Sequence, residues 1–177
     1  MKDSERKLVS ELIKNSRRSE RELAKAIGVS QPTIGRMLKK LAKVGAIREY
    51  TMIPDFRQLG YTLMAFTFVK LKSALRPEQV EKARQVARES LTEAPKELVF
   101  LERGIGLGYN GLLITFHQDY SHYKEFRKWL TEFDFLEISD LQGFIVNLDG
   151  TAHYRPLTFQ TLAKHLLTLA ENDGRTL

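Results

Sequence analysis

The chain has 177 residues, of which 42% are hydrophobic and 28% charged, a composition typical of a folded globular protein with room for two small domains. It contains no cysteine, which excludes disulfides, cysteine nucleophiles and thiolate metal sites. No apolar run approaches the roughly 20 residues that span a bilayer, and the charged start MKDSERKLVSEL lacks the pattern of a secretory signal, so we expect a cytoplasmic protein.

Positive charge is concentrated in the first part of the chain. Residues 1–50 hold 13 Lys and Arg against 6 Asp and Glu, while the remaining 127 residues hold 15 against 16. Residues 1–50 therefore carry a surplus of +7 and the rest of the chain −1, which together give the formal net charge of +6. This asymmetry is typical of a nucleic-acid-binding module joined to a near-neutral partner domain.

Three helices are predicted within this basic segment. The first runs from Ser4 to Lys14 with Asp3 as its cap. Residues 19–45, SERELAKAIGVSQPTIGRMLKKLAKVG, then predict two short amphipathic helices joined by a tight turn at Gly28, where a positive φ is needed. The apolar positions that should form their common core are Leu8, Val9, Leu12, Ile13, Leu23, Ala24, Ile27, Val29, Ile34, Leu38 and Leu41.

The ends of the last two helices carry recognisable caps. Ser19 and Glu22 form the S-x-x-E capping box, and Ser30 is the N-cap of the second helix of the pair. Pro32 lies in the first turn, where a missing N–H costs little, and Gly45 ends the helix at its C′ position.

With its apolar side buried, the last of these helices exposes a polar and cationic face. This arrangement is typical of a DNA-binding helix-turn-helix, in which the second helix enters the major groove of double-stranded DNA. Gln, Thr and Arg side chains can contact base edges, whereas flanking cations bind phosphates. The predicted DNA-binding residues are Arg17, Arg18, Ser30, Gln31, Thr33, Arg36, Lys39, Lys40 and Lys43. A plain helical hairpin with solvated lysines is the alternative.

Beyond residue 45 the pattern changes to strands and helices in alternation. The predicted elements are a β-prone wing (46–54), a turn-rich linker (54–60), strands at 61–72, 97–103, 112–117 and 140–149, and helices at 77–91, 120–133 and 156–170. The order β-α-β-β-α-β over residues 61–150 is ferredoxin-like. The predicted fold is therefore α+β: a winged helix-turn-helix domain (1–53), a linker (54–60), a ferredoxin-like βαββαβ domain (61–150) and an amphipathic C-terminal helical extension (151–177).

Apolar surfaces in the second half of the chain suggest self-association. The strand at 61–72 is apolar on both faces, and the two helices of the domain can cover only one of them, so we expect a second subunit to bury the other. The last helix carries Phe159, Leu162 and Leu166 at helical spacing, followed by Leu169 and Ala170. With no partner for this side in the βαββαβ domain, we expect the helix to support assembly.

Two features that invite other chemistry are explained by structure alone. The glycine-rich GIGLGYNG (104–111) joins two predicted strands and has no GK[ST], so we interpret it as a turn rather than a phosphate loop. The four histidines, His117, His122, His153 and His165, do not have the spacing of a metal site. We therefore expect no metal and no cofactor.

The combined pattern resembles the Lrp/AsnC family of transcriptional regulators. LAKAIGVSQPTIGRMLKKLAKVGAIREY has the family's L-A-x-x-x-G-V-S, the Arg at Arg36 and the G-x-I-x-x-Y turn, and LGYTLMAFTFVKL resembles the entry into its regulatory domain. The resemblance covers residues 3–150. It implies a transcriptional regulator that dimerises through the sheet domain, often assembles into tetramers or octamers, and commonly senses amino acids.

The resemblance also implies an effector region between the second and third strands. Its residues would be Ile105, Gly106, Leu107, Gly108, Tyr109 and Asn110. Gly108 matches the family's glycine, but Gly111 stands where the family usually has an aspartate, which removes a partner for an amino acid's ammonium group. The family's usual glycine before the last strand is also missing from EFDFLEISD.

Two other functions fit parts of the pattern. One is a DNA-organising protein of low sequence specificity that oligomerises through the sheet domain. The other is an enzyme related to siroheme decarboxylases, which resemble diverged members of the same architecture. That enzyme would need histidine and arginine side chains around a porphyrin pocket, and the sheet domain is poor in histidines that could converge.

Overall fold

The computed structural model describes residues 1–89, 97–133, 136–150 and 157–173, without the side chains of residues 87–89 and 169–173. The chain divides into two compact units. One comprises Met1–Ile53 together with Tyr154–Leu177, and the other is Pro54–His153. Within the described ranges, no helix is both long and apolar enough to cross a bilayer.

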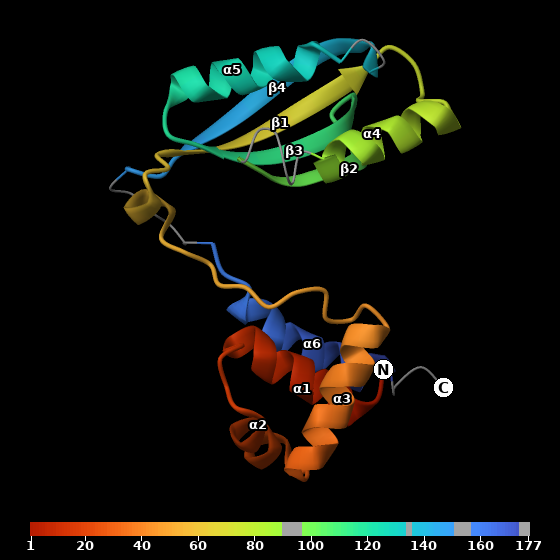
Figure 1. Cartoon of the computed structure of the whole chain (residues 1–177), viewed down its shortest axis with the longest axis vertical. Coiled ribbons are helices and arrows are strands. Elements are labelled where there is room, and N and C mark those ends of the chain that lie inside the picture. The colour runs from red at the N-terminus through yellow and green to blue at the C-terminus, as the bar shows by residue number, and fades with distance from the viewer. Residues whose placement is uncertain (90–96, 134–135, 151–156, 174–177) are drawn as a thin grey trace. The chain divides into compact units, whose positions relative to one another are not determined.

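Three helices form the centre of the first unit (Figure 1): α1 (Asp3–Lys14), α2 (Glu20–Ile27) and α3 (Gln31–Lys43). Each of them contributes to one core, because none can bury its apolar side alone. The buried residues are Leu8, Leu23, Ala24, Ile34 and Leu41, surrounded by Val9, Leu12, Ile27, Val29, Met37, Leu38 and Ile47. This confirms the predicted core, except that Ile13 is only half-buried and lies outside the cluster.

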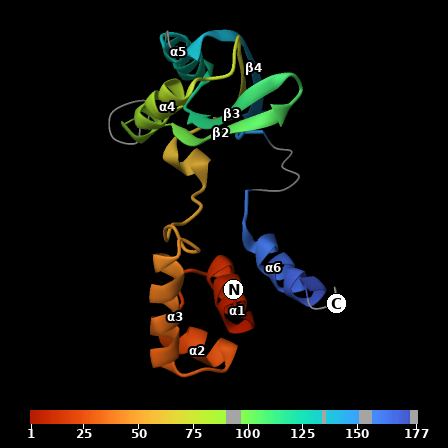
Figure 2. The same cartoon turned by 90° about the vertical axis from the view of Figure 1, so that its right-hand side faces the viewer.

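A fourth helix, α6 (Gln160–Asp173), packs against α1 in the same unit, and two views place them side by side (Figures 1 and 2). The buried Ser10 hydroxyl donates to the backbone O of Ala163 at 2.8 Å, and Ala163 itself is fully buried. The small alanine lets the two helices approach closely enough for this bond. Phe159 and Leu162, which were predicted to share one apolar side of this helix with Leu166, are both half exposed.

The side chains of Leu169 and Ala170, which were also expected on that side, lie outside the described part of the chain. Helix α6 packs against α1, which lies outside the βαββαβ domain, and nothing in the structure tests its predicted role in assembly. That role stays a prediction.

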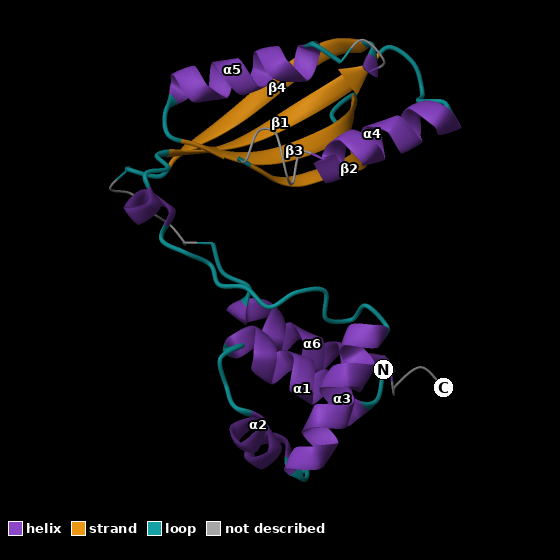
Figure 3. Cartoon of the chain, in the orientation of Figure 1, coloured by secondary structure: helices purple, strands orange, loops and turns teal. Residues whose placement is uncertain are grey.

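The second unit is a four-stranded antiparallel sheet in the order β2-β3-β1-β4 (Figure 3). Its strands are β1 (Leu63–Leu71), β2 (Leu98–Gly106), β3 (Tyr109–His117) and β4 (Ile138–Asn147), and its helices are α4 (Pro77–Glu89) and α5 (Tyr120–Thr131). The order of these elements is βαββαβ, which confirms the ferredoxin-like fold. Leu91, the predicted end of the helix before β2, lies outside the described residues.

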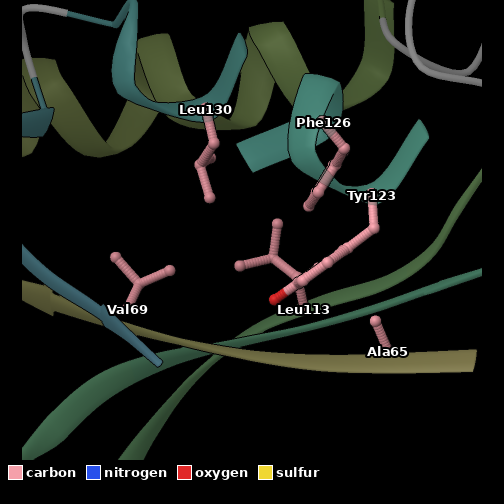
Figure 4. Packing of buried hydrophobic residues seen from close by; sticks show 6 residues of the cluster. All are labelled: Ala65, Val69, Leu113, Tyr123, Phe126 and Leu130. Atoms are coloured by element: carbon pink, nitrogen blue, oxygen red, sulfur yellow. The ribbon is translucent and has the colours of Figure 1, made fainter. Parts of the chain in front are cut away.

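One face of the sheet packs against α5 (Figure 4). The buried cluster joins Ala65, Val69 and Leu113 of the sheet to Tyr123, Phe126 and Leu130 of α5, as their spacing predicts. The Tyr123 hydroxyl lies 3.3 Å from the Thr67 hydroxyl, so this polar group is satisfied inside the core.

The opposite face of the sheet is apolar and open. Phe66 of β1 pairs with Ile114 on one side and Phe144 on the other, and the two phenyl rings lie 6.5 Å apart. Phe144 is 64% exposed. A short 3-10 helix (Phe56–Leu59) covers one end, where Phe56 stacks on Phe116 at 3.8 Å.

Two local expectations differ from the structure. Residues 46–55 form neither helix nor strand, although Ala46–Pro54 was predicted as a wing; a strand needs a hydrogen-bonded neighbour, and the one-chain structure supplies none here. Helix α1 begins at Asp3 with Lys2 as its N-cap, so Asp3 is not the cap. Glu5 provides the capping interaction by accepting a hydrogen bond from the Lys2 N–H at 2.8 Å.

Because Gly143 of β4 has no side chain, the phenol ring of Tyr123 can lie directly against the backbone of the sheet. A substitution at Gly143 tests this close contact. A Cβ at Gly143 would meet the Tyr123 hydroxyl and lie 3.0 Å from its Cζ. Because Tyr123 is buried and cannot swing away, Gly143→Ala should destabilise the second unit by about 1–3 kcal/mol. Urea unfolding followed by the fluorescence of Trp129 measures this change.

Gly104→Ala is the matched control, because a Cβ there meets no atom within 4 Å. It should change the stability by less than about 0.5 kcal/mol. Equal effects of the two substitutions would contradict the proposed crowding at Tyr123.

Candidate nucleic-acid interface

The helix-turn-helix is held by local hydrogen bonds at the start of α2. The Glu22 N–H donates to the Ser19 hydroxyl at 3.3 Å, and the Ser19 N–H donates to Glu22 Oε2 at 2.8 Å, which confirms the capping box. Hydrogen bonds from the Ser19 hydroxyl and N–H lower the pKa of Glu22. At the other end, Gly28 has a φ of 78° and closes the helix, as the turn requires.

The start of α3 is more open. Ser30 occupies the N-cap position, but its hydroxyl pairs with the Thr33 hydroxyl at 2.8 Å instead of a backbone N–H. Gln31 and Pro32 are exposed in the first turn. Gly45 follows the helix with a φ of 72°, in agreement with its predicted C′ position.

Helix α3 has two opposed faces. Ile34 and Leu41 are buried in the core, whereas Arg36, Lys39 and Lys43 follow one another at spacings of three and four along the exposed side. Neither Lys39 nor Lys43 forms an ion pair with any residue in the described ranges. The exposed side of α3 therefore presents a row of cations to a ligand; we call Arg36, Lys39 and Lys43 the α3 cation row.

Arg36 is only loosely held in this position. Its Nη2 lies 3.4 Å from the Thr33 hydroxyl and its Nε lies 3.4 Å from the carbonyl of Pro32. Contacts of this length are weak, so the guanidinium is free to rearrange toward a base edge. Thr33, Gln31 and Arg36 thus share the N-terminal half of α3, which is the part that a helix-turn-helix presents to bases.

Three of the predicted cations have different surroundings. Arg18 pairs with Glu11, which also pairs with Lys14. Arg17 is exposed, and its backbone N–H donates to Asn15 Oδ1 at 3.0 Å. Lys40 places its Nζ 2.6 Å from Glu5 Oε1.

Glu5 is the residue at this surface that the sequence analysis missed. Its side chain is 6% exposed and joins α1 to α3 through Lys40. The hydrogen bond from Lys40, followed by the bond from the Lys2 N–H, lowers the pKa of Glu5 below its ordinary value of 4.5. Its position three residues before Leu8, on the apolar side of α1, was the available signal, since a carboxylate there requires a partner.

The predicted effector residues lie at and beside the tip of the β2–β3 hairpin, which confirms that GIGLGYNG joins two strands. Ile105 and Leu107 are fully or largely exposed, and Leu107 has an unusual φ of 54°. Tyr109 donates to Asp140 Oδ2 at 2.6 Å, which raises the pKa of the phenol, and Asn110 Oδ1 accepts the N–H of Leu71 at 2.8 Å. Ile105 and Leu107 therefore face solvent, whereas the side chains of Tyr109 and Asn110 are held by Asp140 and the backbone of Leu71.

The described histidines have structural or surface positions. His117 is fully buried, its Nε2 lies 2.7 Å from the Thr115 hydroxyl, and burial lowers its pKa. His122 pairs with Asp119 at 3.0 Å, which raises its pKa. His153 lies outside the described residues, and His165 is exposed on α6. Among the described residues, no group of three potential ligands could hold a metal ion.

The bond between Glu5 and Lys40 makes the stability of the first unit depend on pH. Because the folded pKa of Glu5 is lowered, its contribution is complete above the ordinary value of 4.5 and is lost as the pH falls through the folded pKa. Glu5→Gln should therefore lower the thermal midpoint at pH 7 and reduce the loss of stability below about pH 4.5. Circular dichroism melts at a series of pH values measure both effects.

Glu49→Gln removes an exposed carboxylate from the same unit and serves as the control. This variant should have nearly the same thermal midpoint at pH 7 as the native chain, and the same loss of stability at low pH. If Glu5→Gln lost as much stability below about pH 4.5 as the native chain, another carboxylate would be responsible for the acid sensitivity.

Comparisons with known proteins agree with the arrangement of α2 and α3. Residues 1–48 match the family described as winged helix-turn-helix DNA-binding. An uncharacterised HTH-type transcriptional regulator of Pyrococcus abyssi is 38% identical over 99 residues, which cover 56% of this chain and 61% of the relative. The aligned stretch thus spans about three-fifths of that relative's length.

Solved structures extend the likeness to both units. An AsnC family transcriptional regulator from Agrobacterium tumefaciens has a TM-score of 0.69 at 22% identity and covers 92% of this chain and 99% of its own. A transcriptional regulator from Neisseria meningitidis in complex with L-Met has a TM-score of 0.65 at 23% identity over 92% and 99% of the two chains. The likeness confirms the predicted fold: both units have the fold of Lrp/AsnC-type regulators, and residues 1–48 resemble winged helix-turn-helix DNA-binding domains.

Proposed function

We propose that this protein is a sequence-specific, DNA-binding transcriptional regulator of the Lrp/AsnC type. The α3 cation row carries this proposal, because it lies opposite the buried side of α3 and faces solvent. Matched relatives are named as transcriptional regulators, which supports the same function and gives no support to an enzyme. Its partner would be double-stranded DNA, which places its action in the cytoplasm with the chromosome.

In this function, α3 would enter the major groove. Gln31, Thr33 and Arg36 would contact base edges, with Arg36 donating both of its terminal N–H groups to a guanine. Ser30, Lys39 and Lys43 would bind phosphates, together with Arg17 at the start of the motif. Arg18 and Lys40 are weaker candidates, because each already pairs with a glutamate.

Arg36→Ala tests the assignment of base contacts. It should weaken binding to the preferred site by about 1–3 kcal/mol and relax the preference at one base pair per half-site. Selection of bound duplexes from a random pool, followed by titration of the native and variant chains, measures both. Lys124→Ala removes one exposed cation from α5 and should leave the selected sequence and the affinity unchanged.

The same titration separates this function from low-specificity DNA organisation. A regulator should bind its selected site far more tightly than random DNA at the same salt concentration. If a dimer neutralises six to eight phosphates, log affinity should fall against log salt with a slope of about −5 to −7. Affinities for selected and random DNA that agree within about threefold would favour the organising protein instead.

We further propose that the protein acts as a homodimer or a larger homo-oligomer, such as a tetramer or octamer, formed through the open face of the sheet. Phe66, Ile114 and Phe144 give that face an apolar centre that no described helix covers. Burial of such a patch against a second copy is the usual way to remove it from water. A two-fold dimer would then favour a DNA site with two half-sites about one helical turn, or a multiple of it, apart.

Phe144→Glu tests the sheet interface. A carboxylate in the centre of the apolar patch should dissociate the dimer, because it would be buried without a partner. Light scattering measures the mass. Tyr120→Glu is the control, since Tyr120 is an exposed aromatic residue at the start of α5, on the other side of the sheet. A native mass for Phe144→Glu would place the interface elsewhere.

The proposed function includes modulation by a small-molecule effector. The complex of a similar structure with L-Met supports small-molecule sensing, and Ile105–Asn110 stay the proposed region for an amino acid. The siroheme-decarboxylase alternative gains no support, because His117 is enclosed in the core and His122 pairs with Asp119.

A further inference from the structure

A cavity of about 440 Å³ lies between the helix-covered face of the sheet and the helices α4 and α5. Most of its wall is aliphatic or aromatic: α4 contributes Val80 and Ala83, α5 contributes Trp129 and Leu130, and the sheet contributes Leu101 and Leu113. Its volume is in the range of small-molecule sites, which are mostly apolar with a few polar groups that orient the ligand.

A glycine in β3, Gly111, leaves room for this cavity because it has no side chain. Gly111 of β3 pairs with Val69 of β1 and with Arg103 of β2. It belongs to the side of β3 that also carries the buried Leu113, so a side chain at Gly111 would project into the cavity. Its Cβ alone would already lie 3.3 Å from the Cβ of Val69.

The polar groups of the wall are mainly hydrogen-bond donors. Arg103 lies on the same side of the sheet as Leu101 and Leu113, and its side chain has no hydrogen-bond or ion-pair partner among the described residues. Asn110 uses its Oδ1 to accept the N–H of Leu71, which leaves its NH₂ group as a donor. Glu102 also borders the cavity, but it pairs with Leu112 and so belongs to the opposite side of β2.

We propose that this cavity binds an apolar carboxylic acid, with its hydrocarbon body under α4 and its carboxylate at Arg103 and Asn110. An arginine guanidinium is the best partner for a carboxylate, and an apolar wall accepts a hydrocarbon body. A free amino acid fits less well, because the described wall offers no carboxylate on the ligand's side for its ammonium group. The inference rests on the proposed function only in regarding the ligand as an effector; binding itself needs no DNA.

Trp129 reports on the site directly, because it lines the cavity and is the only tryptophan in the chain. We would titrate the full chain with decanoate and with 4-phenylbutanoate, which distinguish a linear from an aromatic body. The controls are 1-decanol, decylamine and L-leucine. At least one of the two acids should change the Trp129 fluorescence saturably, and it should bind more tightly than all three controls.

Two variants locate the two ends of the ligand. Arg103→Gln should raise the Kd of the bound acid about tenfold, the loss expected for one charged hydrogen bond, and leave binding of decanol unchanged. Arg57→Gln removes an arginine of the same unit that does not line the cavity, and should change neither Kd. Ala83→Phe fills the space under α4 and should abolish binding of the acid.

Several results would overturn the proposal. They are the absence of a saturable response to both acids, an equal Kd for the acid in Arg103→Gln and the native chain, and a rise of the Kd in Arg57→Gln as large as that in Arg103→Gln. Because Arg103→Gln changes an exposed side chain, it tests the proposal even if Ala83→Phe does not fold. A failure of the regulator function would appear in the DNA titrations and would leave these fluorescence measurements unaffected.

Discussion

Burial of Ile34 and Leu41 against Leu8 and Leu23 is the packing on which the first unit depends. Burial of these side chains fixes the rotation of α3 about its own axis. The residues on the opposite side of the helix must then face water. The α3 cation row is thus positioned by apolar contacts on the far side of the helix. Glu5 adds to this, because its ion pair with Lys40 ties the flank of α3 to α1.

The second unit applies the same rule to a sheet. Alternate residues of β1 point to opposite faces, and only one face lies under helices. On the covered face, Tyr123 and Phe126 fill the space at the α5 side, whereas the space beneath α4 is incompletely filled. The two faces therefore differ: one is an uncovered apolar surface, and the other contains a cavity of about 440 Å³.

Most of the fold was predictable because its signals are local. The capping box at Ser19, the glycine turn at Gly28 and the 3.6-residue spacing of apolar side chains depend on neighbours within a few residues. The order of strands and helices was predictable for the same reason.

Three features that were not predicted depend on distant parts of the chain. The pairing of Glu5 with Lys40, the burial of Ala163 rather than Phe159, and the cavity beside Gly111 involve partners that periodicity does not specify. In the candidate site, the exposed face of α3 followed from spacing, but the ion pairs that hold Arg18 and Lys40 did not. Residues 46–55 were predicted in part as a strand from their β-prone composition, but they form none. Composition alone does not supply a neighbouring strand to pair with.

The bond from Ser10 to Ala163 spans 153 positions in the chain, and the whole second unit lies between its two ends. During synthesis, the N-terminal helices leave the ribosome first, while the segment that covers the Ser10 side of α1 emerges only after the sheet has been made. The packing of α6 on α1, which completes the first unit, can therefore form only after the second unit has been synthesised. A nascent chain interrupted before α6 would carry an uncovered α1 surface, and exposed apolar surface of this kind makes incomplete chains prone to aggregate.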